Sequence, residues 1–487
     1  MSIKNYLAGT DNTITDAYRP ESGTRRMSDI NFGLTENLEV YSLYNTVTAS
    51  VADNGRARIL IQFNTGQMLV DRSAGDLPAS GSVTFYLQMK NYPHSSTTPT
   101  SSIIQISPLS RAWEEGRGIS FDDMSNEIGS NWLTASSKPK VMWSSDGGDV
   151  RASPISKYTF DTGVEDLSIN ITPYVESILT DAVTDYGLLL QLTASQESAS
   201  QSHYKKGFYS AQYFDFHKRP LIQARFNNSI QDNGGNLYLS ASRVTAASNL
   251  NTIYLYNYIK GNLVNIPSIG TGDLYVSVYS GSTETTPSGS KLALPLGGGV
   301  VAAADTNITG SYVSAGIYSA SFAFNSSSLE NIFAVWHDNT TEFHTSSVLR
   351  PDARPFPNYR KTNKYYLSIT NLKETYMNTH SSRLRLFVRD PSIAPTVQTT
   401  ATTTMEPTQI EKAYYRVIRK RDKLEIIPYG TGSDNEEYTL LSYDSKGNYF
   451  DLDFSNFNSG TIYTLSFMFY ENGQYREQAQ KFDFGTA

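Results

Sequence analysis

Apolar and polar residues alternate at every second position along much of this chain. The segments 57–63 (ARILIQF), 83–89 (VTFYLQM) and 383–389 (RLRLFVR) show this period clearly. Successive side chains of a strand point to opposite faces, so each segment predicts a half-buried β-strand. One segment has a helical period instead: 173–179 (PYVESIL), with Thr172 as the expected N-cap and Pro173 at the first helical position. Further strands are expected over 103–107, 167–171, 187–192, 221–226, 253–259, 274–280, 316–324, 332–338, 365–372, 413–419 and 463–469.

The composition agrees with an all-β protein. The chain has 487 residues with 33 tyrosines and 22 phenylalanines, and aromatic residues favour pleated surfaces. Single cores stop growing near about 250 residues, so several domains are expected. Two polar or proline-rich segments, 227–236 and 350–360, predict the boundaries. We therefore expect three tandem β-sandwiches: a jelly roll over 1–228, an immunoglobulin-like sandwich over 229–355, and a C-terminal β-sandwich over 356–487.

Tryptophans concentrate around one charged loop of the first domain. Trp113 lies in the loop 111–123, and Trp132 and Trp143 follow it, so three of the four tryptophans fall in a short stretch. Burying an indole contributes on the order of 2–3 kcal/mol, which favours an inward Trp113. We expect this loop to fold back over the edge of the sandwich and close it, with Trp113, Glu114 and Gly116 as the closing residues.

The order of these segments resembles the DNRLRE-type domain, a jelly-roll β-sandwich of bacterial surface proteins and phage proteins. The resemblance covers about the first 228 residues. It implies a fold and an extracellular or particle-surface setting, and it supplies no catalytic residue. The matching positions are Arg58, Phe63, Trp113, Glu114, Gly116, Ile171, Thr172, Val175, Gly187, Leu188, Ser210, Arg219, Pro220 and Leu221.

Charge and cysteine content exclude several functions. The net charge is −7 and no Lys/Arg run is present, so we expect no nucleic-acid binding and no binding to an acidic membrane. The absence of cysteine excludes disulfides and thiol catalysis. No apolar run approaches about 18 residues, which predicts no membrane span, and the first residues lack the apolar segment of a signal peptide.

No catalytic or metal-binding constellation is expected. Glu114–Glu115 and Asp122–Asp123 could form a glycosidase-like carboxylate pair, but adjacent strand residues face opposite sides, so solvating loop charges are the favoured interpretation. The acidic turns 146–149 and 232–236 could bind Ca²⁺, and plain turns are favoured. The six histidines are dispersed, and no GxSxG or phosphate loop occurs. We therefore expect no enzyme, no cofactor and no metal.

The carboxyl half resembles virion structural proteins of T4-like tailed bacteriophages, on the segments 365–390, 412–419, 441–454 and 461–473. The resemblance implies a virion protein of the neck, tail, baseplate or capsid exterior. Such a protein is assembled in the host cytoplasm and contacts other virion proteins and copies of itself. The expected contact residues are three arginines of one strand face, a tyrosine row and a Thr-rich arm: Arg383, Arg385, Arg389, Tyr254, Tyr256, Tyr258 and 399–404. The alternative is a fibre-like host-attachment protein that binds a host glycan.

Overall fold

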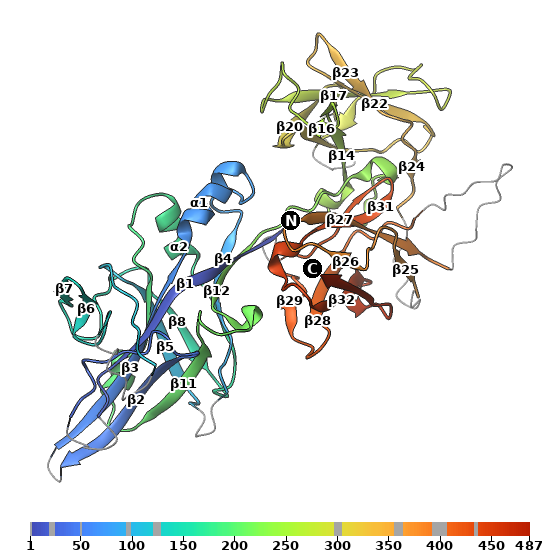
Figure 1. Cartoon of the computed structure of the whole chain (residues 1–487). Coiled ribbons are helices and arrows are strands. Elements are labelled where there is room, and N and C mark those ends of the chain that lie inside the picture. The colour runs from blue at the N-terminus through green and yellow to red at the C-terminus, as the bar shows by residue number, and fades with distance from the viewer. Residues whose placement is uncertain are drawn as a thin grey trace. The chain divides into compact units, whose positions relative to one another are not determined.

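The computed structural model describes residues 2–18, 25–48, 51–93, 99–119, 128–296, 304–354, 364–391, 407–432 and 437–487. The protein is all-β with tandem β-sandwiches, as expected, and its helices are few and short. It divides into two compact units, coloured mainly blue to green and green to red in Figure 1. The first unit comprises Met1–Asn227, Gly432–Tyr438 and Asn456–Asn458, and the second comprises Asn228–Thr431, Thr439–Ser455 and Ser459–Ala487. The division of the second unit at residue 355 stays a prediction.

The first unit is built mainly from long antiparallel strands. Its helices are α1 (Thr65–Ala74), α2 (Thr172–Leu179) and α3 (Ala194–Glu197). Its strands are β1 (Ile3–Thr15), β2 (Asn37–Thr48), β3 (Val51–Phe63), β4 (Thr84–Met89), β5 (Ser102–Pro108), β6 (Thr134–Ser137), β7 (Lys140–Met142), β8 (Ser156–Phe160), β9 (Leu167–Asn170), β10 (Leu188–Leu192), β11 (His203–Tyr209) and β12 (Leu221–Arg225).

Strand β1 connects the two layers of this sandwich. Its first residues, Ile3–Leu7, pair with β12, and from Ala8 onward β1 pairs with β3, with a bulge between Ala8 and Thr10. The resulting order is β8-β5-β10-β3-β1-β12-β4-β9, with β2 on β3 and β11 on β2. The end strands β8 and β9 approach each other where Ser156 Oγ donates to the Asn170 carbonyl at 3.3 Å. The sheet is therefore nearly closed around its core.

The predicted alternation identifies the strand side chains that form the core. Ile59, Ile61 and Phe63 of β3 are buried in one cluster with Phe85 and Leu87 of β4. The opposite face of β3 is also covered, because Leu60 on that face is buried in a second cluster. This sheet is consequently buried on both faces at its centre.

The helices differ from the sequence prediction in two respects. Helix α2 forms where expected, but its N-cap is Ile171, and the Thr172 hydroxyl instead accepts a hydrogen bond from the Phe85 amide at 2.9 Å. The tertiary structure thus uses this hydroxyl to join α2 to β4. Helix α1 was not predicted because its apolar residues give no clear stripe: Leu69 and Val70 are exposed and only Met68 among them is buried. In the described part of the chain no helix is long and apolar enough to cross a membrane.

The second unit consists of several smaller sheets. Its strands are β13 (Leu237–Tyr238), β14 (Leu250–Tyr256), β15 (Tyr258–Ile259), β16 (Asn262–Leu263), β17 (Leu274–Ser280), β18 (Leu294–Pro295), β19 (Ala304–Asp305), β20 (Ile308–Ser314), β21 (Ile317–Ala323), β22 (Ile332–His337), β23 (Glu342–Thr345), β24 (Pro351–Asp352), β25 (Tyr366–Ile369), β26 (Thr375–Tyr376), β27 (Ser381–Arg389), β28 (Ala413–Arg419), β29 (Glu425–Ile427), β30 (Ser442–Asp444), β31 (Gly447–Asp453), β32 (Ile462–Glu471), β33 (Gln474–Glu477) and β34 (Phe482–Thr486).

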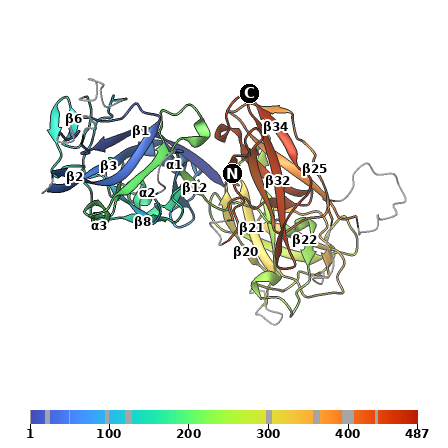
Figure 2. The same cartoon turned by 90° about the horizontal axis from the view of Figure 1, so that it is seen from below.

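Three sheets organise this unit. One has the order β14-β21-β20-β17-β22-β23, a second β25-β27-β31-β30, and a third β26-β34-β32-β28-β29 with β33 on β32. The neighbouring strands β32 and β34 of the third sheet are seen in Figure 2. The predicted alternation in β27 is confirmed, since Leu384, Leu386 and Val388 are all buried.

Candidate functional site

The Trp113 loop lies on a sheet face of the first unit. The Trp113 indole donates to the Tyr186 carbonyl at 2.9 Å, and its ring is partly buried against the second apolar cluster. That cluster comprises Ile14, Leu60, Leu109, Trp132, Ala135, Trp143 and Leu189. Leu60 and Leu189 point away from the main core and are covered mainly by residues that follow the loop, Trp132, Ala135 and Trp143. Trp113 packs against this cluster, so the cover lies over the outer face of the sheet and not over its edge as the sequence led us to expect.

Glu114 and Gly116 fix this loop in place. Glu114 Oε2 accepts hydrogen bonds from the Ser137 amide and hydroxyl, both at 2.9 Å, and the amide bond is the main cause that lowers the pKa of Glu114. Gly116 is packed so closely that a Cβ there would lie 2.0 Å from Asn31 Oδ1. Both residues have a structural role here. Asp122 and Asp123, the other carboxylates of the expected pair, lie outside the described residues.

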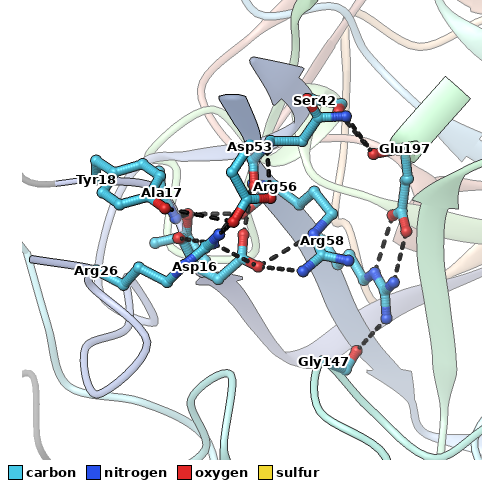
Figure 3. Close-up of polar contacts among 12 residues, drawn as sticks. Asp16, Ala17, Tyr18, Arg26, Ser42, Asp53, Arg56, Arg58, Gly147 and Glu197 are labelled. Atoms are coloured by element: carbon cyan, nitrogen blue, oxygen red, sulfur yellow. Dashed lines mark hydrogen bonds and ion pairs between the residues drawn. The ribbon is translucent and has the colours of Figure 1, made fainter. Parts of the chain in front are cut away.

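Arginines and carboxylates form a network in the first unit (Figure 3). Arg58 donates to the Glu197 carboxylate at 2.9 and 2.6 Å and to the Gly147 carbonyl at 2.9 Å. Its guanidinium carbon is 4.7 Å from the centroid of the Trp132 ring, and that of Arg56 is 5.0 Å away on the same ring. The two arginines therefore anchor the indole by cation–π contact.

The remaining charges of the network balance these arginines. Asp16 is buried and accepts from Arg56 at 3.0 Å, and it also pairs with Arg26 at 3.1 Å. Arg26 pairs in addition with Asp53. With Arg58 and Glu197, the network holds three arginines and three carboxylates, so it presents no surplus charge to a ligand. Sequence reasoning found only Arg58, through the family resemblance, because the partners are distant in the chain.

Two of the three predicted tyrosines belong to a junction inside the second unit. The Tyr254 and Tyr256 rings of β14 stack with centroids 6.3 Å apart. The hydroxyls of Tyr256 and of Tyr449 on β31 share a hydrogen bond, and burial is the main cause that raises the pKa of Tyr256. The tyrosine row thus joins the first sheet of this unit to the second one.

The predicted arginines lie in the same junction. Arg383 donates to the Asp451 carboxylate at 2.8 and 3.0 Å, and Arg385 donates to the Asp444 carboxylate at 3.0 and 2.8 Å. Both guanidinium groups also lie near the Tyr449 ring, with carbon-to-centroid distances of 4.4 and 5.2 Å. The hydrogen bond from Arg383 to Asp451 is the main cause that raises the pKa of Arg383. The acidic partners that the structure gives these two arginines therefore come from the same chain.

Residues 230–233, part of the predicted linker 227–236, are hydrogen-bonded on both sides. The Asp232 amide donates to the Tyr443 carbonyl at 3.1 Å, and the Tyr443 amide donates to the Ile230 carbonyl at 2.9 Å. On the other side, the Thr252 amide donates to Asn233 Oδ1 at 3.0 Å. The segment is consequently a structural bridge between β14 and β30.

Tyr258 and Arg389, the remaining two predicted contact residues, are exposed. Tyr258 is 59% exposed, and Arg389 is exposed at the end of β27. Arg389 is the register partner of Tyr366 on β25, whose side chain is 63% exposed. The Thr-rich arm at 399–404 lies outside the described residues.

The acidic turns use their oxygens internally. The Asp149 carboxylate accepts from the amides of Ser144 and Ser145 at 2.9 Å and pairs with Arg111 at 3.2 Å. Asp232 Oδ1 accepts from the Gly234 amide at 2.9 Å, and burial raises the pKa of Asp232 to about 6. Across the described ranges, no three His, Asp or Glu side chains converge in a metal-binding group.

One buried carboxylate pair was missed by sequence reasoning. Asp11 has no exposed surface, and its Oδ2 accepts from the Ala211 amide at 2.5 Å, while no described group hydrogen-bonds to its Oδ1. The Asp11 backbone amide donates to Glu115 Oε1 at 3.2 Å, which places the Glu115 carboxylate beside this residue. Burial raises the pKa of Asp11 to about 7, and the Glu115 charge adds to this rise. The two residues are 104 positions apart, and no local pattern connects them.

Comparisons with known proteins identify no family. No family model and no curated protein matches the chain. Solved structures that match include the FN1–FN3 domains of chicken CNTN1, with 9% identity, 80% of this chain and 90% of that chain covered, and a TM-score of 0.15. Two others are the α2-macroglobulins of Salmonella (9% identity, TM-score 0.15) and E. coli (8%, 0.16), each covering 99% of this chain and 26% of the macroglobulin. This chain therefore spans about a quarter of each macroglobulin, and at these TM-scores the similarities carry no argument.

Proposed function

We propose that this protein is a non-enzymatic structural component of a tailed-bacteriophage particle and that it acts through protein–protein contacts. The observation that carries the proposal is the exposed pair Tyr366 and Arg389 at a sheet edge. Tyrosine and arginine are enriched among the residues that dominate interface energies. Among the described residues, no strand pairs with the outer side of β25, so backbone groups are available there as well.

The internal pairing of charged residues also supports a scaffold role. Arg58, Arg383 and Arg385 are each satisfied by carboxylates of this chain, and each pair ties together segments that are distant in the sequence. Such pairs fix the shape of a rigid body but leave no charge for chemistry. The phage setting itself rests on the resemblance of the carboxyl half to virion proteins. The proposed partners are neighbouring virion proteins or further copies of this chain.

A binding experiment tests the contact surface. Particles that lack this protein would be incubated with the purified protein or with the variant Tyr366→Ala/Arg389→Ala. We expect the double variant to bind about tenfold more weakly or worse, because both anchor side chains are removed. Tyr475→Ala removes a tyrosine that is 47% exposed on β33 and serves as the matched control. Equal binding by the double variant would refute the assigned surface, and a cryo-EM map of the intact particle without this chain would refute the virion role.

Carbohydrate binding is a second candidate, favoured by one aromatic surface of the first unit. Phe214 is 73% exposed, and its ring lies 4.5 Å from that of Tyr213, centroid to centroid. Exposed aromatic rings can stack on sugar faces. Binding on a glycan array that is lost in Phe214→Ala would support host attachment over the structural role.

A further inference from the structure

Lys206 of β11 carries its ammonium group into the core of the first unit. The residue is 1% exposed. Its Nζ donates to Asn91 Oδ1 at 2.6 Å, to the Glu165 carbonyl at 2.7 Å and to the Gly163 carbonyl at 3.0 Å. A lysine this deeply buried is rare, because removing its charge from water is costly.

The surroundings of Lys206 are aromatic. Its Nζ lies 4.6 Å from the centroid of the Phe160 ring and 5.4 Å from that of Phe208, and both rings belong to the main core. Burial lowers the pKa of Lys206 to about 8, while the charges of Glu165 and Asp166 act in the opposite direction. A lysine with such a pKa is partly a neutral amine near neutral pH, and a neutral amine is a nucleophile.

Asn91 is held against this amine by the backbone on both sides. Asn91 forms a bridge with Phe208, which is two residues from Lys206 on the same strand face. The Tyr92 amide donates to the Gly207 carbonyl at 3.0 Å, and the Tyr209 amide donates to the Lys90 carbonyl at 3.1 Å. These backbone contacts hold the carboxamide close to the amine. Such fixed proximity accelerates reactions between neighbouring groups by large factors.

We propose that Lys206 and Asn91 form an intramolecular amide cross-link in the folded protein. The neutral amine attacks Cγ of Asn91, a bond forms between Cγ and Nζ, the bond between Cγ and Nδ2 breaks, and ammonia leaves. One proton passes from Nζ to the leaving nitrogen, and nothing is oxidised or reduced. The reaction needs no co-reactant.

Two carboxylates act on the Lys206 charge, and Glu165 has the larger effect of the two. The Glu165 carbonyl holds Nζ at 2.7 Å, while its carboxylate accepts a hydrogen bond from the Thr162 amide. Asp166 is engaged with the Lys90 ammonium and the Asn91 amide, both at 2.8 Å.

The cross-link would join two strands of the nearly closed sheet by a covalent bond. Residues 90–92 continue β4 and pair with the edge strand β11, so the bond would join the two strands at that seam. It would also connect positions 115 residues apart in a chain that has no cysteine. Long closed loops restrict the unfolded chain most, so this position is an effective one for a covalent tie.

Mass spectrometry of the purified full chain tests the proposal. We expect the intact mass to be lower than the sequence mass by about 17 Da, the mass of one ammonia, and peptide mapping to find the Lys206 and Asn91 peptides joined. A succinimide at an asparagine would give the same loss without joined peptides, and that result would overturn the proposal. The full sequence mass in a protein that unfolds cooperatively would overturn it too.

Variants make the assignment specific. Lys206→Arg and Asn91→Ala should each restore the full sequence mass, whereas Lys205→Arg should keep the loss because Lys205 pairs with Glu39 on the other face. A loss that persists in Lys206→Arg would contradict the site. The peptide map of the wild-type chain decides the question even if both variants fail to fold.

The pH dependence of the reaction is a further test. The rate of cross-linking after refolding of the wild-type protein should rise between pH 6 and 9, roughly as Lys206 loses its proton. Equal rates at pH 6 and pH 9 would contradict attack by the neutral amine.

Discussion

The buried carboxylates Asp16 and Glu197 have arginines beside them, and these opposite charges offset part of the cost of removing a carboxylate from water. Asp11 is different, because the neighbouring charge that acts on it is that of another carboxylate, Glu115. The protein therefore holds Asp11 more easily as a neutral acid than as an anion.

This difference predicts a pH-dependent effect of Asp11→Asn. The pKa of Asp11 rises from 3.8 to about 7 on folding, so its neutral form favours the fold below pH 4 and that contribution is lost as the pH rises through 7. Asparagine keeps the shape and stays neutral. We expect the variant to be more stable than the wild type by about 1–3 kcal/mol at pH 8 and equally stable at pH 4, measured by urea unfolding.

The control for this experiment is Asp146→Asn. Asp146 is exposed in the same unit, so its substitution should change the stability by less than about 0.5 kcal/mol at either pH. A destabilised Asp11→Asn variant at pH 8 would mean that the buried carboxylate is ionised and satisfied, contrary to the geometry described above.

At the scale of elements, the segment from Trp113 to Trp143 covers an apolar face of the sheet. Its close packing depends on Gly116, where any side chain would collide with Asn31. The sequence predicted which side chains of strand β3 face the main core. The outer cluster was not, because Leu60 and Leu189 become neighbours only when β3 and β10 pair.

Gly116→Ala should therefore destabilise the first unit by about 2–4 kcal/mol, since Asn31 and the loop must move apart. The measurement is thermal unfolding followed by tryptophan fluorescence, which reports on Trp113, Trp132 and Trp143. Gly66→Ala is the matched control, because Gly66 is exposed in α1 and a Cβ there meets only Asn64 Oδ1 at 3.4 Å. A Gly116→Ala variant as stable as Gly66→Ala would contradict the close approach.

At the scale of the whole molecule, four of the six residues expected to contact partners lie in a junction inside the second unit. Tyr256, Arg383 and Arg385 meet around Tyr449, and this junction holds sheets of the second unit together. The exposed residues Tyr258, Tyr366 and Arg389 remain for external contacts. The surface proposed for external contacts is thus separate from this internal junction.

The junction predicts how the second unit unfolds. Tyr256→Ala removes the hydrogen bond to Tyr449 and the ring stacked on Tyr254, which should cost about 2–3 kcal/mol and split one calorimetric transition into two. Tyr258→Ala, from the same row but 59% exposed, should leave the transition unchanged. Identical calorimetric traces for the two variants would show that the junction does not couple the sheets.

The sequence by itself determined the all-β class and the main strands. It also determined which side chains of segments such as 57–63 and 383–389 face inward, because alternation is a local property that burial of one face imposes. Only the tertiary structure decided what the side chains on the other strand faces contact. It paired Arg383 with Asp451, set Asp11 against Glu115 and placed Lys206 on Asn91, each across 68 to 115 positions of chain. Such contacts depend on strand order and register, and these are fixed by the packing of the whole core and not by any local pattern of residues.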